Sequence, residues 1–344
     1  MPLSWTEKLP LGLDGLEENA AVRYGRDGDL VKGDREIRCC VRGCTRWLAR
    51  RRRQQDDDTI FCPEHGISVS TSPTYIYKDY RQNFLVDVPL LQRVKKLKVE
   101  SWRLGNERSE DALTWNVFVS LARMGCLNAA LKVWIGFDGE DEPELFLWGI
   151  QTDSDEPQVW ERLKQVRSSI EQGAGLPTEP DMMLRVPGRV LVLVEAKFGS
   201  SNGTLTGKSD RFGGVAEFLE RYPPSDGRVD PLNRPWIEQQ EPERVLEQLC
   251  RNVLFAQRLA DQGEVPYVVN LLRGAEVENA EAENFEAHLI PSSPVQFRRA
   301  TWEGIRQLPV MDSREAEPLR RYFDTKTNRL EKAFLAGTSN TWAE

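Results

Sequence analysis

The chain has 344 residues, of which 40% are hydrophobic and 29% are charged, and its formal net charge is −8. Together with a mean hydropathy of −0.52, this composition excludes a disordered chain and a chain built of membrane spans. The length allows one large domain with a small one, or two ordinary domains. No basic start followed by an apolar stretch marks a secretory signal, so we expect a cytoplasmic protein with no membrane partner.

Charge is distributed unevenly along the chain. Residues 1–100 carry 18 Lys and Arg against 15 Asp and Glu, whereas residues 101–344 carry 28 against 39. The N-terminal segment is therefore the basic part of the chain.

Four of the six cysteines lie in the same N-terminal segment. The spacings Cys40-x3-Cys44 and Cys62-x2-His65 predict four ligands around one tetrahedral Zn2+. Cys39 is adjacent to Cys40, and because adjacent side chains point in different directions, only one of them should bind the metal. We favour Cys40, because a three-residue gap closes a knuckle more readily. Four protein ligands leave no open position, so this zinc would be structural and would staple a segment of about 36–70.

A run of arginines lies between the two ligand pairs and consists of Arg50, Arg51, Arg52 and Arg53. On a metal-stapled knuckle such a run is a candidate surface for nucleic-acid phosphates. The segment 56–58, which follows closely, contains three aspartates. A solvated loop whose arginines pair with these aspartates fits the charge pattern equally well.

Hydrophobic periodicity predicts alternating helices and strands after residue 109. A serine-capped amphipathic helix begins at Glu110, and a Pro187-Gly188 turn joins two strands, of which the second is apolar on both faces and reads as a buried central strand. Residues 199–240, rich in Gly, Ser, Asp and Pro, read as a long insertion, either functional or a surface loop. The other expected elements are strands over 132–137, 145–150 and 265–272, helices over 157–172 and 242–262, a strand leading into a helix over 297–305, and a charged helical tail from 312.

The end of the buried strand carries two charges, Glu195 and Lys197. Side chains alternate along a strand, so both point to the same face, and the hairpin register can bring Asp181 beside them. Burying this group is costly unless a cation and a substrate phosphate use it. A structural ion pair that caps a core strand is the alternative.

Pro180-Asp181 followed by Glu195-Ala196-Lys197 resembles the signature of the PD-(D/E)XK nuclease superfamily. The resemblance covers about residues 105–310 and implies an α/β restriction-endonuclease-like core, a central mixed sheet flanked by helices. It implies Mg2+ or Mn2+ held by Asp181 and Glu195, with Lys197 orienting the attacking water. It also implies roles for Glu110, an additional acidic residue, and for Gln248 on the helix after the lysine strand.

We therefore expect an N-terminal region with the zinc knuckle over 1–100, a nuclease-like domain over 101–311 and a helical tail over 312–344. The expected activity is metal-dependent cleavage of DNA, in restriction or anti-phage defence by analogy with the family, as a homodimer or with a partner defence subunit. RNA or branched substrates stay open. The alternative is a protein of this fold that binds nucleic acid or a partner without cleavage. Because no phosphate-binding loop motif occurs, we expect no nucleotide cofactor in this chain.

Overall fold

The computed structural model describes residues 31–32, 36–39, 44–49, 60–69, 75–97, 104–152, 156–170, 179–205, 214–224, 227–274 and 285–324. The chain divides into two compact units, each assembled from segments that are distant in sequence. The first unit comprises residues 1–89, 100–124 and 306–344, and the second comprises residues 90–99 and 125–305. Helix α2 (Val88–Leu97) begins at a boundary between the units.

The described N-terminal residues of the first unit include five short strands that pair antiparallel. Strands β1 (Val31–Lys32), β2 (Glu36–Arg38) and β3 (Trp47–Ala49) form a three-stranded sheet, and β4 (Ile67–Val69) pairs with β5 (Tyr75–Tyr77). A 3-10 turn, η3 (Tyr80–Asn83), follows. Sheets this small cannot bury a core of their own, which is the situation in which a bound metal stabilises a fold.

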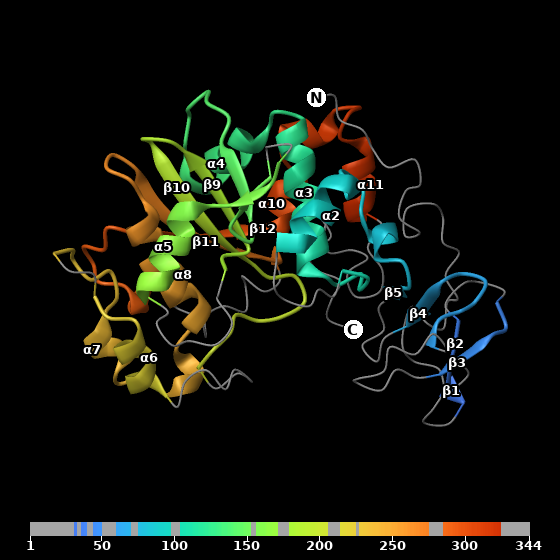
Figure 1. Cartoon of the computed structure of the whole chain (residues 1–344), viewed down its shortest axis with the longest axis horizontal. Helices are drawn as coiled ribbons and strands as arrows, with labels where there is room; N and C mark the ends of the chain where they lie inside the picture. The colour runs from blue at the N-terminus through green and yellow to red at the C-terminus, as the bar shows by residue number, and fades with distance from the viewer. Residues whose placement is uncertain are drawn as a thin grey trace. The chain divides into compact units, whose positions relative to one another are not determined.

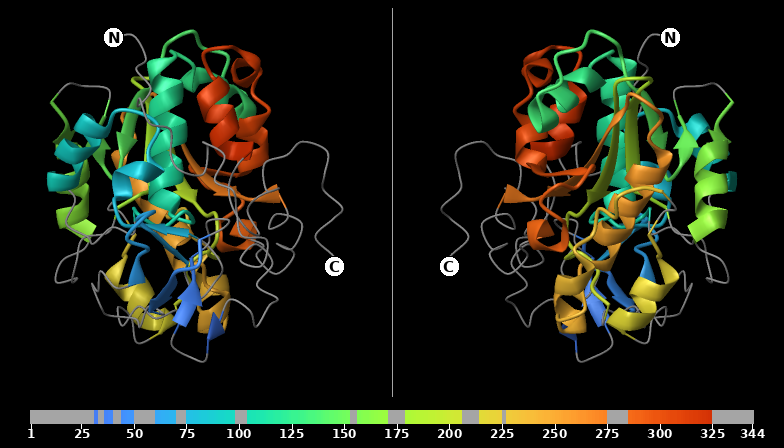
Figure 2. Two further views of the ribbon diagram at one scale, coloured as in Figure 1. Left: turned by 90° about the vertical axis from the view of Figure 1, so that its right-hand side faces the viewer. Right: turned by 90° about the vertical axis from the view of Figure 1, so that its left-hand side faces the viewer.

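Helix α3 (Glu110–Arg123) is the centre of the rest of the first unit. Ser109 caps it as predicted, since its Oγ accepts a hydrogen bond from Ala112 N at 3.2 Å. The helix was expected to be amphipathic, but every residue from Ala112 to Leu121 is buried. Its polar residue Asn116 is satisfied there, accepting from Leu85 N and donating to Asn83 O, each at 2.8 Å. Helix α11 (Glu317–Asp324) lies beside α3 (Figure 2) and is the helix that the structure describes within the expected tail, and the 3-10 turn η7 (Pro309–Asp312) packs against α11. The tail as a whole stays a prediction.

The second unit is an α/β structure built on a seven-stranded mixed sheet (Figure 1), which confirms the expected central mixed sheet flanked by helices. The strand order is β12-β11-β10-β9-β6-β7-β8. Strands β10, β11 and β12 are parallel, and every other neighbouring pair is antiparallel. The strands are β6 (Glu144–Leu147), β7 (Ile150–Gln151), β8 (Gln158–Val159), β9 (Met182–Val186), β10 (Val190–Ala196), β11 (Val265–Leu272) and β12 (Gln296–Thr301).

Strand β10 is the buried central strand that its composition predicts. All seven of its residues are buried, and it joins β9 through the predicted Pro187-Gly188 turn, where Gly188 takes a φ of +71° that favours glycine. The predicted strand at 265–272 is β11, and the strand leading into a helix is β12 followed by α10 (Trp302–Arg306).

Helices α8 (Glu247–Leu259) and α5 (Glu161–Ile170) lie side by side in front of the sheet in Figure 1, and α8 packs against β10 and β11. The core includes Leu191, Leu193 and Val253, all fully buried. A helix over 242–262 was expected. Its first part is instead the 3-10 turn η4 (Pro242–Arg244), and α8 begins three residues later.

Two sequence-based strand predictions were wrong in whole or in part. Residues 132–135 of the expected strand over 132–137 belong instead to helix α4 (Leu127–Ile135), whose residues Leu127, Leu131 and Trp134 are buried with helical spacing. A short apolar run does not distinguish a strand from a buried helix, which explains the error. The run 145–150 contains a turn, since Trp148 and Gly149 have φ of 52° and 73° and reverse the chain between β6 and β7.

The insertion at 199–240 is not one long loop. It contains α6 (Val215–Arg221) and α7 (Arg234–Ile237), and the Arg234 guanidinium donates to Leu219 O at 2.9 Å and Tyr222 O at 2.6 Å. The 3-10 turn η6 (Phe285–His288) precedes β12. Among the described residues no single helix is long and apolar enough to cross a membrane, although α3 and α4 taken together pass a test of length and composition.

Candidate metal centre and candidate active site

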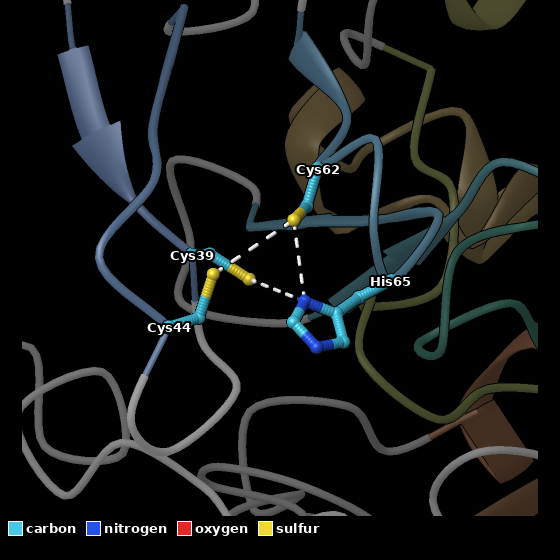
Figure 3. Close-up of side chains that lie close together, drawn as sticks. All are labelled: Cys39, Cys44, Cys62 and His65. Atoms are coloured by element: carbon cyan, nitrogen blue, oxygen red, sulfur yellow. Dashed lines mark hydrogen bonds between the residues drawn. The ribbon is translucent and has the colours of Figure 1, made fainter.

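Three cysteines and one histidine meet at the N-terminal strands of the first unit (Figure 3). Cys39 follows β2, Cys44 precedes β3, and Cys62 and His65 lie in the turn before β4. The turn is tight, because Gly66 N donates to Cys62 O at 2.7 Å. Two chain reversals therefore each supply two of the four side chains.

The spacing of the ligand atoms fits a tetrahedral metal ion. His65 Nδ1 lies 3.2 Å from Cys62 Sγ and 3.6 Å from Cys39 Sγ, and Cys44 Sγ lies 3.9 Å from Cys62 Sγ. All four ligand atoms lie within 4.8 Å of one another. Bond lengths of about 2.3 Å to sulfur and about 2.0 Å to nitrogen place tetrahedral ligand atoms about 3.5–3.8 Å apart. The group can therefore hold a structural metal ion.

The group contains Cys39 in the position that the spacing argument assigned to Cys40. Cys40 itself lies outside the described residues. Cys39 N donates to Arg46 O at 2.9 Å, which extends the β2–β3 pairing by one residue and fixes Cys39 beside β3. A four-residue gap therefore closes this knuckle, which the preference for the shorter gap did not anticipate. Arg50, Arg51, Arg52 and Arg53 also lie outside the described residues, and their contact with nucleic acid stays a prediction.

Burial raises the pKa of the Cys44 thiol to about 11, and the neighbouring sulfurs of Cys39 and Cys62 add to the rise. Without a cation the sulfur keeps its proton at neutral pH. Since the thiolate is the form that binds metal, metal uptake at this group would release a proton from it.

The second candidate site lies at the end of β10 in the second unit. The β9–β10 ladder pairs Met182 with Val194, so one step further Asp181 stands opposite Glu195. Residues that are opposite in an antiparallel pair share a face of the sheet. Asp181 is fastened to β10, because its Oδ2 accepts a hydrogen bond from Ala196 N at 2.9 Å.

Lys197 and Glu195 point to the same face, as strand alternation predicts. Lys197 Nζ lies 2.6 Å from Glu195 Oε1, and their side chains are 7% and 2% exposed. The Lys197 backbone is held on both sides, since its N–H donates to Leu271 O at 2.8 Å and its carbonyl accepts from Trp302 Nε1 at 2.9 Å. Two opposite charges are thus buried together, each compensating the other.

Sequence reasoning missed Asn252, which contacts this pair from α8. Its Nδ2 donates to Glu195 Oε2 at 2.8 Å, and the residue is fully buried. The available signal was a polar residue among the apolar residues of α8 that face the core, Leu249, Cys250 and Val253.

The other predicted site residues have different surroundings. Gln248 Oε1 accepts from Gly203 N at 2.7 Å, so its described contact is with the loop after Lys197. A Cβ at position 203 would lie 2.8 Å from that oxygen, so a larger residue there would require the Gln248 side chain to shift. Glu110 is the first residue of α3 in the first unit. Catalytic roles for both residues stay predictions.

The residues at the end of β10 suit a hard divalent cation by their chemistry. Asp181 and Glu195 offer carboxylate oxygens on one face of the sheet, and Mg2+ is commonly bound by one or two carboxylates with waters and substrate phosphates completing its shell. Within the described ranges, the only group of three or more His, Cys, Asp or Glu side chains close enough to share an ion is the Cys/His group of the first unit. Most of the shell of a cation here would thus come from water and substrate. Comparisons with protein-family models, curated proteins and solved structures found no match to this chain.

Proposed function

We propose that the second unit is a Mg2+-dependent nuclease of the PD-(D/E)XK type, which hydrolyses phosphodiester bonds in DNA. The observation that carries the proposal is the convergence of Asp181, Glu195 and Lys197 at one end of a buried strand. The order of elements supports it: the antiparallel strands β6, β9 and β10 are followed by α8 and by β11, which is parallel to β10. This is the strand and helix order on which the resemblance rests.

Each residue has a definite task in this reaction. Asp181 and Glu195 would hold the cation, which polarises the scissile phosphate and acidifies a bound water. Lys197 donates to Glu195 in the structure described here; in the reaction its ammonium would orient the attacking water and offset the charge that develops on the phosphate. The backbone bonds of Lys197 to Leu271 and Trp302 keep its position fixed while the side chain changes partner.

We also propose that the Cys/His group of the first unit binds Zn2+ in a structural role. Three sulfurs and one imidazole nitrogen are a donor set that zinc prefers, and four protein ligands leave no position for substrate. The short strands β2, β3 and β4 around the group gain their stability from the bound ion.

Recognition of nucleic acid without cleavage is the second candidate, and one observation favours it. Both oxygens of Glu195 already have hydrogen-bond donors, Lys197 and Asn252, and Glu195 is 2% exposed. A structural ion pair would look the same. The two candidates differ in whether a divalent cation displaces Lys197.

Calorimetric titration of the intact protein with Mn2+ tests the proposed function. We expect binding by the wild type and its loss in Asp181→Asn, because the amide oxygen can still accept the bond from Ala196 N while the negative charge is gone. Unchanged Mn2+ binding in Asp181→Asn, at a site that does not require this carboxylate, would reject the proposed metal site. No Mn2+ binding by the wild type would favour recognition without cleavage.

A further inference from the structure

A row of polar side chains crosses one face of the sheet in the second unit. Glu195 on β10 is the register partner of Asn270 on β11, and both are almost completely buried. Two residues earlier on the same face the side chains are apolar and belong to the core: Leu193, Val268 and Phe297. Glu195 therefore stands where the face changes from apolar to polar, with α8 packed above it.

Asn252 on α8 fixes the orientation of the Glu195 carboxylate. Its Nδ2 donates to Oε2 at 2.8 Å, whereas Lys197 Nζ lies 2.6 Å from Oε1. Because each oxygen has its own donor, from a helix on one side and from the strand end on the other, rotation of the carboxylate breaks at least one bond.

The described structure satisfies only part of the buried amide of Asn252. Its Oδ1 is buried and has no hydrogen-bond partner among the described residues. Burying an unsatisfied acceptor destabilises the fold, and an apolar side chain at such a position does not carry that cost. The one described contact that uses the amide is the bond from Nδ2 to Glu195.

We infer that Asn252 is a positioning residue for the divalent cation, which acts by holding Glu195. The inference rests on the proposed function. A cation at Glu195 competes with Lys197 for the carboxylate, whereas the bond from Asn252 persists and keeps the carboxylate on the same face as Asp181. Hydrogen bonds from outside the ligand set orient metal-binding carboxylates in this way, and their loss weakens metal binding.

The test measures Mn2+ affinity by calorimetry in the intact protein for Asn252→Leu and Asn252→Ala. The matched control is Gln257→Leu, which removes another buried carboxamide from α8. Gln257 Nε2 donates to Val229 O, and its Oε1 also lacks a described hydrogen-bond partner. We expect Mn2+ affinity to fall about 10-fold to 100-fold in both Asn252 variants and to stay at the wild-type value in the control. The Mn2+ concentration for half-maximal cleavage should rise by the same factor, with the rate at saturating Mn2+ changed less.

Two results would overturn the inference while leaving the proposed function intact. One is wild-type Mn2+ affinity in whichever Asn252 variants keep the wild-type unfolding transition. The other is an equal loss of affinity in Gln257→Leu, which would assign the effect to α8 as a whole. Absence of Mn2+ binding by the wild type contradicts the proposed function itself, and the inference with it.

Discussion

Replacing Lys197 by methionine tests the buried ion pair at the end of β10. The substitution shortens the side chain by one atom and removes its charge, which leaves the Glu195 carboxyl at 2% exposure without its ionic partner. Breaking one partner of a buried pair costs about 3–5 kcal/mol of unfolding free energy. Because Asn252 still donates to Glu195 Oε2, and a bond to a charged group contributes about 1.5–3 kcal/mol, we expect the lower end of that range, about 3 kcal/mol.

The assay is urea unfolding followed by circular dichroism, with the control Lys164→Met. Lys164 pairs with Glu161 on the surface of α5 at 3.0 Å, where both side chains are more than half exposed. Loss of such a pair costs about 0–1 kcal/mol. The double variant Glu195→Gln with Lys197→Met should be less destabilised than the sum of the two single variants, by at least about 1 kcal/mol, because the charges are removed together.

Addition of Mn2+ should stabilise Lys197→Met more than the wild type. In the wild type the cation must displace the Lys197 ammonium from Glu195, whereas in the variant no ammonium competes for this carboxylate. A Lys197→Met variant within about 0.5 kcal/mol of the wild type, or strict additivity in the double variant, would refute the assignment of a coupled buried pair. Equal stabilisation of both proteins by Mn2+ would refute competition between Lys197 and the cation.

Three further predictions concern other parts of the chain. Metal analysis should find about one zinc per chain, retained in Cys40→Ser and lost in Cys39→Ser; the opposite pattern would restore the first choice of ligand. Ser109→Ala should lower the unfolding free energy by about 1 kcal/mol through loss of the α3 cap, and no change in urea unfolding would contradict the capping role. Burial raises the pKa of Glu303 above its ordinary value of 4.5, against a weaker opposing effect of the bond from Gly274 N. The stability from its protonated form is complete below 4.5 and is lost as the pH rises through the folded-state pKa, so Glu303→Gln should gain stability relative to the wild type as the pH rises above 4.5. A pH-independent difference would disprove this.

Much of the second unit could be predicted because its strands carry strong local signals. Strand β10 is apolar on both faces and follows a Pro-Gly turn, so its burial and its partner β9 follow from sequence alone. Helix α4 could not be distinguished from a strand, because its assignment depends on which side chains the tertiary structure buries. The two helices within 199–240 are seven and four residues long and have no clear periodicity in so short a span.

In the candidate sites, too, contacts set by local sequence could be predicted and contacts between distant segments could not. Alternation along a strand predicts that Glu195 and Lys197 share a face, and hairpin register predicts the approach of Asp181. Asn252 comes from a helix more than fifty residues later, and nothing local in the sequence specifies that contact. The choice between Cys39 and Cys40 depends on where β2 ends, and strand ends are the least predictable feature of a sequence.

Cleavage by the wild type and by Asp181→Asn tests the proposed activity most directly. Supercoiled, linear, single-stranded and branched DNA, and RNA, are incubated with Mg2+ or Mn2+, and a metal-free series is run alongside. We predict metal-dependent cleavage of at least one DNA substrate by the wild type and its loss in Asp181→Asn at unchanged unfolding free energy. Equal cleavage by both proteins, or no cleavage of any substrate by a wild type that binds nucleic acid without metal, would contradict the assignment of Asp181, Glu195 and Lys197 as a nuclease site.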